Sequence, residues 1–112
     1  MLPSFCRDVV TVKRAPLVEA RGSLIRDWES AIEHQVFGCS FQAASTSRDM
    51  DNRTDQVEVV ATLFANPGAD IEAGDRIEYG NASYELTGEP IPYPGATGAL
   101  DHYEIPLRHW RG

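Results

Sequence analysis

Residue types that could perform chemistry are few in this sequence, and they lie far apart along it. The three histidines, His34, His102 and His109, lack the i, i+4 spacing that places two imidazoles on one helix face beside a metal ion. Cys39 follows His34 by five residues, which in an extended strand puts the two side chains on opposite faces and too far apart to chelate. We therefore expect isolated histidines, no metal site and no cofactor.

The two arrangements that most resemble a reactive site are both incomplete. Asp101 and His102 could be a base and its orienting carboxylate, but neighbours in a strand point apart and no Ser or Cys nucleophile motif accompanies them. Asp49, Asp51 and Asp55 are spaced like calcium ligands, but arginines interrupt them and the glycine and closing glutamate of a calcium loop are missing. The sequence therefore predicts a protein that is not an enzyme.

Cysteine usage and the terminus indicate the compartment. Cys6 and Cys39 are too few for a disulfide framework, and no CxxC motif occurs, so we expect reduced thiols in a cytosolic setting. The first residues lack a basic leader followed by an apolar segment, and no apolar run reaches the length of a membrane span. We expect a soluble, unprocessed protein.

The net charge of −7 is unevenly distributed. Residues 1–26 hold five basic and two acidic side chains, a net +3, whereas residues 27–107 hold 15 acidic and three basic side chains, a net −12. Phosphate contacts need a basic patch, so an acidic body argues against ordinary nucleic-acid binding. An acidic body still allows the protein to line a channel through which DNA moves without binding. The polarity could bring the end of one copy to the body of another, or it could simply be a solvated surface.

At 112 residues the chain is expected to form one domain, residues 1–112, built mainly of strands. Val9 to Lys13 reads as a short strand near an edge of the sheet, and Pro16 stops it. Residues 14–30 are ambiguous. Leu24, Trp28 and Ile32 lie four apart, as on a helix face, but Gly22 and the β-branched residues weaken a helix. An irregular or partly helical connection is expected there, with at most one short helix.

Two further strands flank a long polar segment. Ile32 to Gln42 alternates, and Gly38 is a candidate β-bulge. The alternation predicts one face with Phe37, Cys39 and Phe41, and the other with Val36 and Gly38. Ala43 to Asp55 contains a single sizeable apolar side chain, Met50, and predicts a long mobile loop. Gln56 to Phe64 predicts a central strand with Val57, Val59, Ala61 and Leu63 on one face.

Asn66 to Pro90 contains the strongest local signals, two turns followed by a hairpin. The hairpin strands are Arg76 to Tyr79 and Ala82 to Leu86, joined at Gly80-Asn81 by a two-residue turn of the primed type. Pro90 to Gly98 predicts a rigid, exposed excursion, and Tyr103 to Trp110 a last strand. About six short strands and hairpins predict a small antiparallel β-barrel or sandwich.

Several segments in a characteristic order resemble tailed-phage head-closure proteins, also called head-to-tail stoppers, especially those of siphophages of actinobacteria. The segments are VTVKRAP (Val10 to Pro16), RDW (Arg26 to Trp28), HQVFGCSFQ (His34 to Gln42), PGADIEAGDRI (Pro67 to Ile77), YELTGEP (Tyr84 to Pro90), GALDH (Gly98 to His102) and the terminal LRHWRG. Together they span nearly the whole chain. The order and spacing carry this resemblance, because each motif alone is mostly turn chemistry.

The resemblance implies a structural virion protein of the head–tail neck, assembled in the host cytoplasm. Such a protein is a small β-barrel that forms a ring of six or twelve copies below the portal and adaptor. The ring retains packaged double-stranded DNA without sequence-specific binding, and its lower face meets a tail terminator or tail tube. A loop between two barrel strands acts as a channel gate in that family. Here the matching residues are Thr46, Ser47, Arg48, Asp49, Met50, Asp51, Asn52 and Arg53.

Trp28 and Trp110 are candidate interface residues, since tryptophan is enriched at the centres of protein interfaces. A role in the core is an equal expectation for Trp28. Two alternatives to the head-closure function remain open at this point. One is a monomeric binding barrel of SH3-like or oligonucleotide-binding type, and the other is a neighbouring connector component such as a tail terminator.

Overall fold

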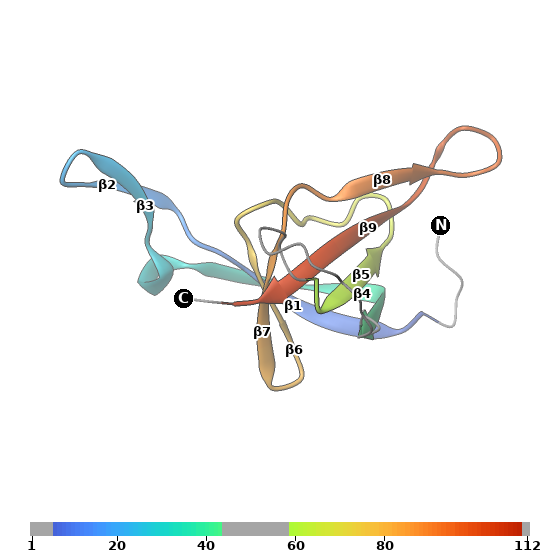
Figure 1. The fold of residues 1–112 in the computed structure, drawn as a ribbon, viewed down its shortest axis with the longest axis horizontal. Helices are drawn as coiled ribbons and strands as arrows, with labels where there is room; N and C mark the ends of the chain where they lie inside the picture. Colours follow the sequence, from blue (N-terminus) through green and yellow to red (C-terminus); the bar gives the residue numbers. More distant parts are fainter. Residues whose placement is uncertain (1–5, 44–58, 111–112) are drawn as a thin grey trace, which may run out of the picture.

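The structure of the chain is a computed structural model, and it describes residues 6–43 and 59–110. The described part is mainly β, with one turn of 3-10 helix (Figure 1). Its elements are β1 (Asp8–Arg14), β2 (Leu17–Ala20), β3 (Ser23–Arg26), η1 (Trp28–Ser30), β4 (Ile32–Ala43), β5 (Ala61–Ala65), β6 (Arg76–Tyr79), β7 (Ala82–Leu86), β8 (Ile91–Pro94) and β9 (Leu100–His109).

Six of these strands close into an antiparallel β-barrel, which confirms the predicted fold class. The strand order is β5-β4-β1-β6-β7-β9, and the pairing of β9 with β5 closes the sheet. Every barrel strand therefore has a neighbour on both sides. This includes β1, which pairs with β4 and β6, so the prediction that this strand lies near an edge is wrong. The seventh strand of the sheet, β8, pairs only with β9 among the described strands.

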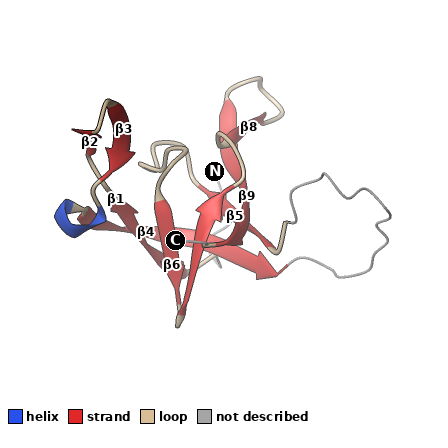
Figure 2. Cartoon of the chain, turned by 60° about the vertical axis from the view of Figure 1, so that its left-hand side comes forward, coloured by secondary structure: helices blue, strands red, loops and turns tan. Residues whose placement is uncertain are grey.

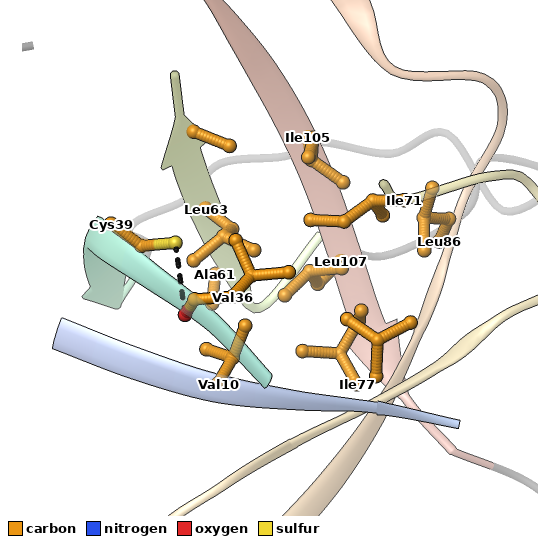
Figure 3. Close-up of a cluster of buried hydrophobic side chains, with 12 residues drawn as sticks. Val10, Val36, Cys39, Ala61, Leu63, Ile71, Ile77, Leu86, Ile105 and Leu107 are labelled. Carbon is orange, nitrogen blue, oxygen red and sulfur yellow. Dashed lines mark hydrogen bonds between the residues drawn. The ribbon is translucent and has the colours of Figure 1, made fainter. Parts of the chain in front are cut away.

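The barrel interior is filled by the inward-facing residues of the strands (Figure 3). In β5 the burial alternates with period two, so that Ala61, Leu63 and Ala65 are buried while Thr62 and Phe64 are only half-buried. Ile105 and Leu107 of β9 repeat this spacing on the neighbouring strand. The predicted central strand with Ala61 and Leu63 on one face is thus confirmed, although it begins at Ala61.

A β-bulge in β4 overturns the predicted alternation of that strand. Asp8 pairs with Cys39 and Val10 with Val36, so the register between β1 and β4 shifts by one residue beside Gly38, whose φ is 72°. The extra residue turns both Val36 and Cys39 inward and leaves Phe37 64% exposed. Gly38 is the bulge that the sequence predicts, but Phe37 does not share a face with Cys39.

The turns and the hairpin of Asn66 to Pro90 are confirmed. Gly68 and Gly74 occupy two turns with φ of 90° and 93°, and the hairpin strands β6 and β7 have the predicted bounds. Gly80 has φ 62°, whereas Asn81 is not among the described residues with positive φ, which matches a type II′ turn.

Two connections differ from their predictions. Residues 14–30 form a two-stranded β-hairpin, β2 and β3, followed by the short helix η1, in place of an irregular connection. The excursion at Pro90 to Gly98 includes strand β8, which pairs with β9. The two prolines of β8 are tolerated because the strand lies at the edge of the sheet. The predicted loop of Ala43 to Asp55 falls almost entirely on residues 44–58, which lie outside the described residues.

Candidate interaction surfaces

The β2–β3 hairpin, called the arm here, projects from the barrel (Figures 1 and 2). Its two strands pair with each other from Leu17 with Arg26 to Ala20 with Ser23, and with no other strand in the described part of the chain. Arg21 and Gly22 form the turn, with φ of 54° and 83°, the pattern of a type I′ turn. The sequence signal was the Arg-Gly pair between two short apolar runs, which the helical spacing of Leu24, Trp28 and Ile32 concealed.

Both faces of the arm expose apolar side chains. One face carries Leu17 and Leu24, which are 53% and 67% exposed. The other carries the cross-strand pair Val18 and Ile25, at 37% and 49%. A two-stranded hairpin is at best marginally stable by itself in water, and these side chains find no cover on their own barrel. The arm thus has the composition of a docking element.

Polar contacts between its two ends close the base of the arm. The Asp27 amide donates to the carbonyl oxygen of Pro16 at 2.9 Å, and Arg26 Nη1 donates to that of Ala15 at 3.0 Å. The Arg26 guanidinium also lies over Gly74, where any Cβ would collide with it. The guanidinium is the flexible end of its side chain, so the positive φ of 93° is the main reason for glycine at this turn.

Trp28 and Trp110, the two tryptophans singled out in the sequence, lie against each other beside the arm's base. Their rings are edge-to-face with centroids 4.8 Å apart, and the Arg76 guanidinium lies 5.0 Å from each ring centroid. Arg76 Nε is buried without a hydrogen-bond partner among the described residues, and lies 3.6 Å from a carboxylate oxygen of Glu78. This cluster, called the tryptophan clamp, joins η1, β6 and the end of β9 through cation–π contacts. Both tryptophans remain half-buried, so the structure assigns them a packing role within the chain and leaves the interface role untested.

At the far end of the barrel, β8 and the start of β9 form a second surface with exposed apolar groups, called the β8 end. Ile91 and Tyr93 are 42% and 40% exposed, and Tyr93 stacks on His102 of β9 with centroids 5.5 Å apart and an interplanar angle of 2°. His102 lies between two carboxylates, with Nδ1 at 2.7 Å from Asp101 and Nε2 at 3.2 Å from Glu104. These partners, Asp101 first, raise the pKa of His102, although partial burial opposes them.

Asp101 and His102, the candidate base and its orienting carboxylate, are therefore in contact, although neighbours in a strand are predicted to point apart. Their hydrogen bond is part of a surface hairpin that includes Tyr93 and Glu104, and it orients a ring that stacks on Tyr93. His34 lies elsewhere, on β4, where Nε2 donates to the carbonyl oxygen of Asp70 at 2.8 Å. The described part of the chain contains no group of three or more His, Cys, Asp or Glu side chains that could hold a metal ion.

A buried ion pair holds the 66–75 turns against β1. Asp75 is 1% exposed, and its carboxylate accepts from Arg14 Nε and Nη2 at 2.9 and 2.8 Å and from the Glu72 amide at 2.8 Å. Arg14 Nη2 also donates to Asp70 at 2.9 Å. These bonds, Asp75 first, raise the pKa of Arg14, and the Arg14 bond lowers the pKa of Asp70. Sequence reasoning missed this network, because nothing local links Arg14 to a residue 61 positions away.

The expected gating residues, Thr46 to Arg53, lie outside the described residues. No helix in the described part of the chain is both long enough and apolar enough to cross a membrane. Comparison of the chain with protein-family models, curated proteins and solved structures finds no match. The surfaces are therefore interpreted from the residues of this chain.

Proposed function

We propose that this protein is a structural, non-catalytic subunit of the head–tail connector of a tailed phage. Six or twelve copies assemble as a ring below the portal and adaptor, retain the packaged double-stranded DNA and offer a docking face to the tail. The observation that carries the proposal is the arm, which exposes Leu17, Val18, Leu24 and Ile25 away from a barrel that is otherwise closed.

The closed barrel and the arm support assembly through the arm. Because the six barrel strands pair on both sides, the open strand edges in the described part of the chain belong to the arm and to β8. The exposed apolar groups of the arm gain free energy only when another surface covers them. We therefore expect the arm to drive assembly. A purified copy is expected to be a monomer, and copies are expected to assemble into a ring in the virion neck.

The charge distribution supports a DNA-facing wall. With a net −12 over residues 27–107, the body repels phosphate, so DNA can occupy a channel without adhering to it. A nucleic-acid-binding barrel would need a basic groove with stacking aromatic residues. The proposed contact with packaged DNA is confinement, and it does not depend on a catalytic group.

The test is a reconstruction of the neck from the phage that encodes this chain, together with a null mutant of the gene. We expect a six- or twelve-fold ring of this chain between adaptor and tail, and null-mutant capsids that lose DNA and lack tails. Absence of the chain from the neck would refute the proposal.

A complementation arm makes the test specific to the docking element. The variant Leu17→Gln/Leu24→Gln should fail to restore DNA retention, whereas Ser23→Gln, on the other face of the same strand, should restore it. If both variants restore retention equally, the arm is not an assembly element. A one-to-one complex with an extended peptide and no ring would instead support the SH3-like binding barrel.

A further inference from the structure

We propose that the occupant of the arm is a second copy of this chain, and that the arm docks on the β8 end of that copy. This inference rests on the proposed function and deepens it by naming the two surfaces that meet. The contact joins the Leu17 and Leu24 face of one arm to Ile91 and Tyr93 of the next copy.

The two surfaces lie at opposite ends of the molecule. Figure 1 shows the arm at one end of the long axis and β8 at the other. A contact between two different surfaces of identical chains is heterologous. Two copies joined by one such contact still have one free arm and one free β8 end, to which further copies can bind. Repetition of such a contact closes into a ring when the rotation per copy is suitable.

The chemistry of the two surfaces is complementary. Both have apolar centres, with Leu17 and Leu24 at 53% and 67% exposure and Ile91 and Tyr93 at 42% and 40%. Residues 17–26 carry two arginines and one glutamate, a net +1. Glu19 and Arg26 lie on the Leu17 and Leu24 face, and Arg21, exposed in the turn, supplies the net positive charge. Residues 89–104 carry three acidic side chains, Glu89, Asp101 and Glu104, and no Lys or Arg. Opposite charge around an apolar centre favours this pairing and its register.

The β8 end is also a firm receptor. Pro92 and Pro94 fix two backbone φ angles of β8, and the stack of Tyr93 on His102 orients the exposed ring. A preorganised surface loses less conformational entropy on binding than a flexible one does. The arm is the other partner, and its exposed apolar side chains become buried on this surface.

A second exposed apolar pair, Val9 and Phe37 beside the β4 bulge, is the competing receptor. These side chains are 37% and 64% exposed. Arg7 and Asp8, which precede Val9 on the chain, cancel in charge, so this site lacks the net negative charge of the β8 end. Charge therefore favours the β8 end, and the experiment includes Phe37 as a control.

The experiment uses two variants of the full chain that each retain one half of the contact. Leu17→Gln/Leu24→Gln keeps the β8 end and is labelled with nitrogen-15, and Ile91→Lys keeps the arm and is unlabelled. When the two are mixed they can form a single contact, so the product is a heterodimer that does not grow. We expect saturable amide shifts in the labelled chain at Ile91, Tyr93 and residues 100–104. The same labelled chain carrying Ile91→Lys as well should need at least about ten times more of the unlabelled chain to reach the same shifts.

Two results would overturn the inference. One is the absence of shifts up to about 1 mM of the unlabelled chain, the range of the weakest specific contacts. The other is a set of shifts centred on Val9 and Phe37 that Phe37→Lys abolishes. In the supporting case, Phe37→Lys in the labelled chain leaves the shifts unchanged, and Ile91→Lys weakens the contact at least about tenfold.

The outcome is separable from that of the proposed function. If a neck reconstruction contains a ring of this chain whose arm meets another surface, the inference fails and the proposed function stands. If the chain is absent from the neck but the heterodimer forms, the contact stands and the proposed function fails.

Discussion

The barrel and the arm are both antiparallel sheet, but they solve the problem of exposed edges and faces in opposite ways. In the barrel, six strands close on one another and bury Leu63, Ile77 and Leu107 completely. In the arm, two strands leave outer edges and both faces open, with Leu24 67% exposed. Closure makes a region stable by itself, whereas an open hairpin retains apolar surface that only a partner can bury. The first region therefore determines folding, and the second is the region through which we propose that copies associate.

The sharpest test is the same substitution in both regions. Leu63→Ala removes a fully buried side chain from the barrel and should lower the free energy of unfolding by about 3–4 kcal/mol, because a cavity remains. Leu24→Ala should change it by less than about 0.5 kcal/mol, since its side chain is already largely in water. Urea unfolding of both variants measures the difference. Equal costs would contradict the division between the two regions.

The ion pair under the 66–75 turns should be the next largest contributor. Asp75→Ala leaves Arg14 partly buried without its main acceptor and frees the Glu72 amide, so we expect a loss of about 2–3 kcal/mol. Asp70→Ala is the matched control, because its exposed carboxylate meets the same arginine and should cost clearly less stability than Asp75→Ala. If the two variants lose equal stability, the burial of Asp75 does not explain the contribution of this ion pair to the free energy of unfolding.

The tryptophan clamp lies at the junction of the two regions and tests whether they are coupled. Trp110→Ala removes one ring from Arg76 and Trp28 and should cost about 1 kcal/mol. Faster amide hydrogen exchange is expected first at the arm's base, near Asp27 and Ala31, while β5 stays protected. Uniform acceleration across the barrel would indicate that the clamp supports the core and not the arm.

The smallest expected effect concerns pH at the β8 end. The pKa of His102 is raised in the folded state by Asp101 and Glu104, so protonation favours folding. This contribution is fully present below the ordinary histidine pKa of about 6.5 and is lost as the pH rises through the higher folded value. We expect less than about 1 kcal/mol, measured as the stability of wild type minus that of His102→Gln between pH 5.5 and 8. A difference that does not vary with pH would contradict it.

Local signals predicted much of the barrel. The signals act over a few residues: glycines at turns, the Gly80-Asn81 hairpin, and the alternation of Ala61 and Leu63. The structure confirms the turns, the hairpin and the strand that they predict. The arm was missed because Leu24, Trp28 and Ile32 have helical spacing and because Arg21 is an unusual residue for a turn with positive φ. The faces of β4 were misassigned, since the register shift at the bulge depends on the partner strand β1.

The sequence by itself determined that this chain is a small antiparallel β protein, because turn chemistry and period-two alternation are properties of neighbouring residues. Only the tertiary structure decided which strands close the barrel and that Arg14 meets Asp75 across 61 positions. It also decided that Trp28 and Trp110 both lie against the guanidinium of Arg76. These choices depend on pairings between distant segments, whose free energies are set by burial and closure and not by local preference.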